Sequence, residues 1–304
     1  MRRPGRCHAC YVCTVVVALA PEERVPLRLL GIRDELTSRP WRPPARHWPG
    51  SPLIGGIDEQ AGGTWLAVHP EIPRVACLLN ARGSLADPAG RRSRGDLSLR
   101  AAAEGPGMLS RLAADPDALA RYDPFHLICA TPDSVTELSY LPGGRSPDVR
   151  ALGPDRKNRD RIRPAHADED LGNTAIVREL PEVRRLAPGT HMFTNAGHVY
   201  PVEPGDPAGD PKAAHFADKF AAARPAADPA LPLAQAWGDW LTLAAGDGLD
   251  PADPAAIIVR RDLPDGRVYG TTSVTLVALA DSGIRYDFQS HPGNRDGWYP
   301  VSVD

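Results

Sequence analysis

The sequence predicts an α+β fold in which two antiparallel sheets are covered by helices. Short apolar segments follow one another in the order strands, helices, strands, helices, strands, and turn residues join neighbouring strands. This order lacks the repeated strand–helix–strand units that would indicate a parallel sheet. With 304 residues, of which 42% are hydrophobic and 24% charged, the chain has the composition of a folded protein.

The first part of the chain is predicted to form a hairpin, a loop and two further strands. Residues 13–20 and 25–32 are apolar and joined by a short Pro-Glu-Glu turn, so we expect an antiparallel hairpin. Residues 39–52 are rich in Pro, Arg and Trp and are predicted to form a surface loop, because proline cannot donate to a strand ladder. Strands resume at residues 63–68 and 74–80.

The rest of the chain is predicted to alternate helices and strands around a flexible insertion. Apolar residues at helical spacing predict helices, and short apolar runs bounded by turn residues predict strands. In chain order we expect helices at 96–104 and 108–122, strands at 125–130 and 135–140, a flexible insertion at about 146–170, a strand at 186–195, helices at 211–223 and 231–245, and strands at 256–263, 268–280 and 284–289. Trp237 and Trp240 share one face of the last helix, where they should pack into the core.

The apolar run at residues 12–20 has two interpretations. It is stopped by Pro21 and is well short of the roughly 20 residues that a membrane-spanning helix needs, so we predict no membrane span. The preceding arginines and the small residues Ala18-Leu19-Ala20 imitate a secretory signal with its cleavage site. The run is nevertheless rich in β-branched residues and continues into a strand, which favours a cytoplasmic protein.

Composition and motifs exclude several classes of function. A net charge of −3 provides no overall basic field, so we expect no nucleic acid partner. The sequence has no G-x-G-x-x-G after its first strand, no P-loop, no H-E-x-x-H and no G-x-S-x-G. Cys7, Cys10 and Cys13 form a C-x-x-C-x-x-C run, but a cluster needs a fourth ligand, and Cys77 and Cys129 are isolated. We therefore expect no metal and no cofactor.

Cys13 has the position of a nucleophile whose base is its own α-amino group. A catalytic thiol needs a nearby base, and a cysteine at the start of a chain carries one with a pKa of about 8. Residue 12 is Val, and the GUG codon for Val also serves as a bacterial start codon that is read as Met. We therefore interpret residues 1–12 as an extension, either misassigned or removed before Cys13, and residues 13–304 as a single domain.

From Cys13 onward the sequence resembles the NRDE family, also called the Transport and Golgi organisation protein 2 family. The matching segments follow the family's order across nearly the whole chain. They are CTVVV from Cys13, IRDE from Ile32 with Arg39-Pro40 behind it, GGTWL from Gly62, SRG from Ser93, PF from Pro124, LAPGTH from Leu186, TN from Thr194 and YGT from Tyr269.

The resemblance implies both a fold and a set of site residues. The family resembles the N-terminal-nucleophile hydrolases, especially the penicillin V acylase and bile-salt hydrolase group, which implies a four-layer αββα sandwich. Carried over by motif, Cys13 is the nucleophile and its amine the base, Arg33 holds the thiolate, and Asp34 binds the α-amino group. Asn80 and Asn195 are the implied oxyanion donors.

The sequence departs from the family pattern at three positions. Ile32 replaces the Asn of the Asn-Arg-Asp-Glu motif from which the NRDE family takes its name. Thr272 stands where members usually carry Arg, and Leu79 precedes Asn80 where Thr is common. The first two changes remove polar or charged groups from motif positions. Any activity that depends on those side chains is therefore in question.

Each candidate residue also has a structural interpretation. Arg33 and Asp34 fit a charged strand end with local ion pairs, and both Asn80 and Asn195 fit turns. His191, which could ligate haem iron, fits a structural hydrogen-bonding residue beside a Pro-Gly turn.

Two functions remain open on the sequence. The first is a cysteine amidohydrolase acting on a small acylated amine. The second is a non-catalytic protein that binds or traffics a small ligand, either haem or an acyl-lipid. The ligand or substrate and the oligomeric state are not determined by the sequence.

Overall fold

The computed structural model describes residues 13–143, 181–201, 209–292 and 297–303, and its strands form two antiparallel sheets. In spatial order the first sheet contains β11 (Gly197–Tyr200), β10 (Gly189–Thr194), β1 (Thr14–Leu19), β2 (Leu27–Leu36), β13 (Val268–Ala280), β14 (Gly283–Ser290) and β15 (Trp298–Pro300), with β12 (Arg260–Asp262) paired to β13. The second sheet contains β3 (Trp41–Ala45), β4 (Ile54–Asp58), β5 (Leu66–His69), β6 (Arg74–Asn80), β7 (Phe125–Thr131), β8 (Ser134–Tyr140) and β9 (Glu182–Leu186).

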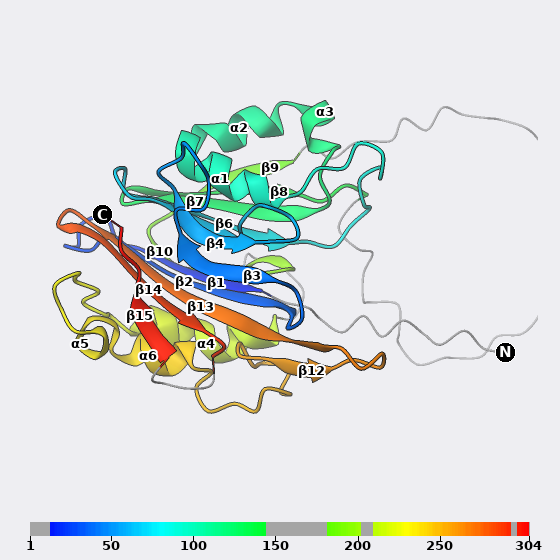
Figure 1. Ribbon diagram of the computed structural model, residues 1–304. Helices are drawn as coiled ribbons and strands as arrows, with labels where there is room; N and C mark the ends of the chain where they lie inside the picture. The colour runs from blue at the N-terminus through cyan, green and yellow to red at the C-terminus, as the bar shows by residue number, and fades with distance from the viewer. Residues whose placement is uncertain (1–12, 144–180, 202–208, 293–296, 304) are drawn as a thin grey trace, which may run out of the picture.

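Helices cover the outer face of each sheet, which confirms the predicted four-layer αββα sandwich (Figure 1). The second sheet is covered by α1 (Gly95–Glu104), α2 (Gly107–Ala113) and α3 (Pro116–Leu119). The first sheet is covered by α4 (Pro211–Ala222), α5 (Leu233–Trp237) and α6 (Asp239–Ala244). The predicted N-terminal extension, residues 1–12, and the predicted insertion at about 146–170 lie outside the described residues.

Strand β1 shows why a continuous apolar run is needed at the centre of the first sheet. Val15, Val17 and Leu19 face the second sheet in one buried cluster. Val16 and Ala18 face the helices α4–α6 in another cluster. Since successive side chains of a strand point to opposite faces, a strand buried on both sides must be apolar throughout. The strand interpretation of this run therefore holds.

Residues 39–52 were predicted to be a loop, and this prediction is wrong because β3 lies within them. β3 is the edge strand of the second sheet, and its pairing with β4 shifts register between Arg42 and Ala45. The two intervening prolines, Pro43 and Pro44, lack an N–H group. An edge strand tolerates prolines where its N–H side is not paired, so the composition did not prevent a strand.

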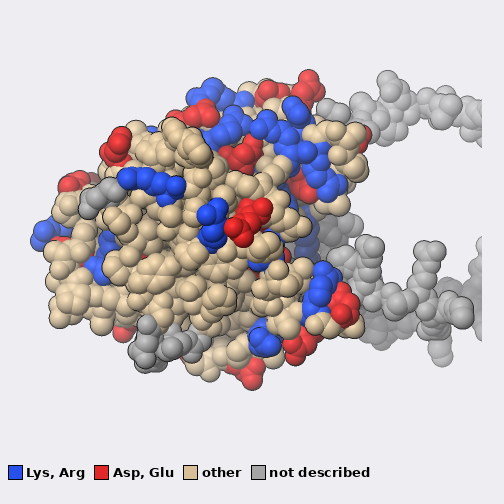
Figure 2. Space-filling view, in the orientation of Figure 1, with Lys and Arg blue, Asp and Glu red and all other residues tan. Residues whose placement is uncertain are grey.

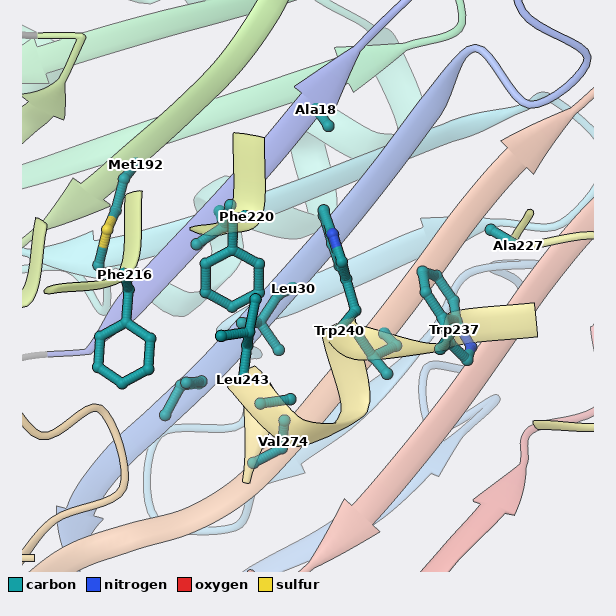
Figure 3. Close-up of a cluster of buried hydrophobic side chains, with 14 of the residues drawn as sticks. Ala18, Leu30, Met192, Phe216, Phe220, Ala227, Trp237, Trp240, Leu243 and Val274 are labelled. Atoms are coloured by element: carbon teal, nitrogen blue, oxygen red, sulfur yellow. The ribbon is translucent and has the colours of Figure 1, made fainter. Parts of the chain in front are cut away.

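Two of the predicted helices are each broken into two shorter ones. The helix predicted at 108–122 divides into α2 and α3, where Pro116 begins the second helix. The helix predicted at 231–245 divides into α5 and α6 at Gly238, whose φ is 49°. Trp237 and Trp240 are nevertheless both fully buried and stacked, with ring centroids 6.0 Å apart, in the cluster between these helices and the sheet (Figure 3).

Other strand predictions differ mainly in their limits. The strand predicted at 256–263 is only β12, because Ala256 and Ile257 are buried without strand pairing, Ile257 in the helix-side cluster. β4 was missed because Gly55 and Gly56 weaken the strand pattern. A Cβ atom at Gly56 would lie 2.3 Å from the Trp65 ring, so the glycine makes room for this tryptophan. β9 was also missed, and the strand predicted at 186–195 is β10 alone.

The outer helical layer is attached to the first sheet by a buried ion pair. Arg285 and Asp287, both on β14, are joined by a 2.5 Å contact, and the Trp237 indole N–H donates to Asp287 at 2.7 Å. Arg285 also donates to the backbone carbonyls of Asp228 and Leu231, at 2.9 and 2.6 Å. The pair therefore fixes the segment that precedes α5.

Replacing Asp287 by Ala should destabilise the protein by about 3–5 kcal/mol, because Arg285 would be left buried without its counter-charge. Urea unfolding monitored by circular dichroism measures this change. Asp262→Ala, at an exposed position, is the matched control and should have little effect. A similar unfolding midpoint for both variants would contradict the role given to the pair.

Candidate active site

Cys13 lies directly before β1, beside the end of β2 that carries Arg33 and Asp34. Thr14 pairs with Ile32 across the two strands, so the register places these residues next to one another. The Cys13 Sγ atom accepts a hydrogen bond from the Asp34 backbone N–H at 3.4 Å. The structure thus brings together three of the five predicted site residues.

Asp34 is a buried carboxylate with one unused oxygen. Its side chain is 0% exposed, and Oδ1 accepts a hydrogen bond from the Thr271 hydroxyl at 2.6 Å. The Lys212 Nζ atom lies 3.8 Å from Oδ2, and Oδ2 has no hydrogen-bond partner within the described part of the chain. Burial raises the pKa of Asp34 to about 6, and the Lys212 charge opposes this increase. The Tyr269 hydroxyl donates to the Asp34 backbone carbonyl at 2.9 Å.

Arg33 is held by groups from both sheets. Its guanidinium donates to the Thr272 hydroxyl at 3.0 Å and to the Asp58 carboxylate at 3.1 Å. It also lies over the Trp65 ring, 4.5 Å from the centroid. Asp58 in turn forms a 2.6 Å ion pair with Arg39. Arg33 is therefore fixed in orientation at the junction of the two sheets.

A bulge in β13 brings both Thr271 and Thr272 against β2. Thr271 pairs with Asp34 and Ser273 with Arg33, so Thr272 is the extra residue between them. Its hydroxyl accepts from Arg33 and donates to the Arg33 backbone carbonyl at 3.1 Å. The departure from the family pattern at this position thus supplies a support for Arg33.

The departure at Ile32, where the family's Asn-Arg-Asp-Glu motif begins, has a simpler explanation. Ile32 is 2% exposed and belongs to the cluster beneath α4–α6. Its side chain packs with that core, on the face of β2 opposite the second sheet. A polar side chain there would need its own buried hydrogen-bond partner.

The thiol of Cys13 is not activated when Cys13 is an internal residue. Burial raises its pKa to about 12, and the negative charge of Asp34 contributes in the same direction. The positive charge of Arg33 lowers this pKa, but less strongly. At neutral pH the group is therefore a protonated thiol, which is a poor nucleophile.

The two candidate oxyanion donors lie on different elements. Asn195 is in the turn after β10, which runs antiparallel to β1, so this turn lies at the end of the sheet where β1 begins. Its Oδ1 atom is buried and has no hydrogen-bond partner among the described residues. Asn80 is the exposed last residue of β6. No hydrogen bond joins either side chain to Cys13 in the described ranges.

Arg94 was not predicted as a site residue, although its Ser-Arg-Gly segment was noted in the sequence. The guanidinium donates to the Pro124 carbonyl at 2.7 Å, and its pKa is lowered mainly by burial while the charge of Asp123 opposes this change. A Cβ atom at Gly63 would lie 2.4 Å from the backbone of Gly95. The glycines therefore allow the close backbone contact between the Gly63 segment and the start of α1.

Lys212, Tyr269 and Thr271 were also missed as site residues. Tyr269 and Thr271 belong to the Tyr-Gly-Thr segment that carried the resemblance. Lys212 had a weaker signal, since it is one of only three lysines in the chain. Its contact with Asp34 joins residues 178 positions apart, and no local pattern encodes such a contact.

His191 has a structural environment. Its Nε2 atom hydrogen-bonds the Ala187 carbonyl at 2.8 Å, and its Nδ1 atom lies 3.0 Å from His198 Nε2. Both ring nitrogens are thus engaged. The described residues contain no group of three or more His, Cys, Asp or Glu side chains suited to hold a metal ion.

Comparison with known proteins identifies the family. The family model described as Transport and Golgi organisation 2 matches residues 12–223. The chain belongs to this family. The match begins one residue before Cys13 and includes β1, β2 and all of the Asn80, Asn195 and Lys212 positions.

Two further comparisons contribute less. A search of curated proteins found no match. Among solved structures, the chain is similar to a Caenorhabditis elegans N-acylethanolamine-hydrolyzing acid amidase (NAAA) ortholog, with 11% identity and a TM-score of 0.32 over 95% of this chain and 100% of that chain.

The helices and the molecular surface add one observation each. Among the helices that the structure describes, none combines the length and apolar character needed to cross a membrane. On the face shown in Figure 2, basic side chains gather along the upper right with acidic side chains beside them, and uncharged surface covers much of the centre.

Alkylation should reveal the state of the Cys13 thiol. In a chain that retains residues before Cys13, the raised pKa predicts iodoacetamide modification at pH 8 at least about tenfold slower than that of free cysteine. The rate should continue to increase above pH 9, because the thiolate fraction is still rising there. Peptide mass spectrometry measures the rate at this site alone. A rate that levels off below pH 9 would contradict the raised pKa.

The His191–His198 pair should make the protein less stable in acid. Burial lowers the pKa of His198 to about 4 and also lowers that of His191. Between pH 6.5 and 4 the unfolded chain therefore binds more protons than the folded one, and stability decreases as pH falls through this window. The urea midpoint should decrease less in His198→Gln than in the unmodified protein. Equal decreases would exclude this contribution.

Proposed function

We propose that this protein is a cysteine amidohydrolase of the N-terminal-nucleophile type that cleaves a small acylated amine. The observation that carries the proposal is the contact of Cys13 with Asp34, whose buried Oδ2 atom has no hydrogen-bond partner among the described residues. A buried acceptor without a donor is unfavourable. The α-ammonium or α-amine of a chain that begins at Cys13 is a donor of suitable chemistry for this atom.

The proposal requires that the chain begin at Cys13. The free α-amine then takes the proton of the Cys13 thiol, which an internal cysteine cannot achieve. The start of the family match at residue 12 supports this requirement, because residues 1–11 lie outside the matched range. Translation from codon 12 with removal of Met, or cleavage of the Val12–Cys13 bond, each produces this terminus.

The reaction proceeds in two steps, acylation of Cys13 and hydrolysis of the resulting thioester. The Cys13 sulfur forms a bond to the amide carbonyl carbon, and the thiol proton passes through the α-amine to the leaving nitrogen as the C–N bond breaks. Water then attacks the thioester carbon, giving a carboxylic acid and restoring the thiol. Asn80 and Asn195 supply amide N–H donors for the oxyanion formed in each step.

Arg33 and Asp34 have separate parts in this scheme. Arg33 places a fixed positive charge near the sulfur, which favours the thiolate that forms during attack. Asp34 orients the amine and thereby the direction in which it accepts the proton. Both residues act without large movement, because each is held by threonine hydroxyls of β13.

The alternative function, non-catalytic binding of haem or an acyl-lipid, is favoured by one observation. In a chain that keeps residues before Cys13, the thiol has a pKa of about 12 and is not a useful nucleophile. Such a chain would bind a ligand without cleaving it, and Cys13→Ala would not change its affinity for the ligand.

The first experiment compares three purified chains on a panel of N-acylated amines. One begins at Cys13, one carries a single Pro before Cys13, and one begins at residue 13 with Cys13→Ala. Only the first should release amine, and the other two should lose at least about a thousandfold in kcat/KM. Intact mass spectrometry verifies each terminus and the acyl-enzyme, which only the first chain should accumulate.

Equal turnover by the Pro-extended chain would contradict the role of the α-amine. Absence of turnover and of any acyl-enzyme in the chain that begins at Cys13 would contradict the hydrolase proposal. Retained binding of haem or an acyl-lipid by all three chains would then favour the alternative.

A further inference from the structure

Lys212 extends from the helical layer to the start of β1. It is in the first turn of α4, and its side chain is only 6% exposed. Its ammonium donates to the Thr14 hydroxyl at 3.3 Å and lies 3.8 Å from Asp34 Oδ2. Thr14 follows Cys13 directly, so one cation contacts the residue beside the nucleophile and the carboxylate beside the thiol.

The start of α4 is held in place by its N-cap. One oxygen of Asp210 accepts from the backbone N–H of Lys212 at 2.8 Å, and its other oxygen accepts from the Thr194 hydroxyl at 3.0 Å. Thr194 immediately precedes Asn195. The same helix start therefore contacts the Asn195 turn, the beginning of β1 and the carboxylate of Asp34.

Several charged or titratable groups face Asp34 from the elements packed around it. They are Cys13, Arg33 and Glu35 at the β1–β2 end, Tyr269 on β13, Arg261 on β12 and Lys212 on α4. Among these, Lys212 has the largest effect in lowering the pKa of Asp34, which burial raises to about 6. A buried carboxylate without such a counter-charge would take up a proton near neutral pH.

We propose that Lys212 is a positioning residue that keeps Asp34 anionic and, by its own charge, keeps the α-amine of a chain beginning at Cys13 unprotonated. The anion is needed to orient the amine. The free-base form is needed because only it can accept the thiol proton. A second cation beside the same carboxylate disfavours protonation of the amine. The effect of Lys212 on the α-amine rests on the proposed function, whereas the pairing of Lys212 with Asp34 does not.

The pairing is tested by carboxyl ¹³C NMR of protein labelled at aspartate, with the Asp34 resonance assigned by its loss in Asp34→Asn. Lys212→Met should raise the Asp34 titration midpoint by about 1–3 pH units. Lys212→Arg should restore it to near that of the unmodified protein. Lys219→Met, on the exposed side of the same helix, is the control and should leave the midpoint unchanged.

An unchanged Asp34 midpoint in Lys212→Met would overturn the pairing, and so would an equal shift in Lys212→Arg. Circular dichroism and thermal unfolding establish that each variant is folded. Should Lys212→Met fail to fold, Lys212→Gln retains a hydrogen-bond donor to Thr14 without the charge and is judged by the same midpoint.

The effect of Lys212 on the α-amine is tested by the pH profile of kcat/KM in the chain that begins at Cys13. Removing the Lys212 charge should move the acid limb to higher pH with little change in KM, and Lys212→Arg should reverse this shift. An unmoved limb would overturn the effect on the amine. If the unmodified chain shows no turnover, the proposed function and the effect on the α-amine fail together, while the NMR midpoint still decides the pairing.

Discussion

The organisation of the candidate site depends on the burial of one carboxylate. Asp34 has no exposed side-chain surface, so each partner that it needs must come from the protein. Thr271 provides a hydrogen bond from β13, and Lys212 provides a counter-charge from α4. These partners come from distant parts of the chain, and their convergence ties the outer helix, the central sheet and Cys13 to one point.

The sandwich explains why such a point lies at the end of the sheets. Between the sheets, the inward faces of β1 and β2 are filled by Val15, Val17, Leu27 and Leu29. Polar groups can gather only where this apolar packing ends, at the first residue of β1 and the last residues of β2. The bulge of β13 occurs at the same level and presents two consecutive hydroxyls to β2.

Sequence patterns predicted the layers better than the limits of the elements. The apolar strands and the amphipathic helices were recognisable because burial on one or both faces imposes a period on the residues. The edge strand β3 was not recognisable, since Pro43 and Pro44 are compatible with both a loop and an unpaired strand edge. Gly238 likewise divided a helix whose tryptophans still occupy the predicted core.

The residue patterns of the sequence determined two antiparallel sheets covered by helices, and its resemblance to a family implied the αββα order and the grouping of Cys13, Arg33 and Asp34. The physical reason is that strand alternation and a short hairpin fix neighbouring residues through local geometry. Only the tertiary structure decided that Asp34 meets Lys212 and that Thr272 supports Arg33. These contacts join residues far apart in the chain, and their energy depends on burial, which exists only after the sheets and helices have packed.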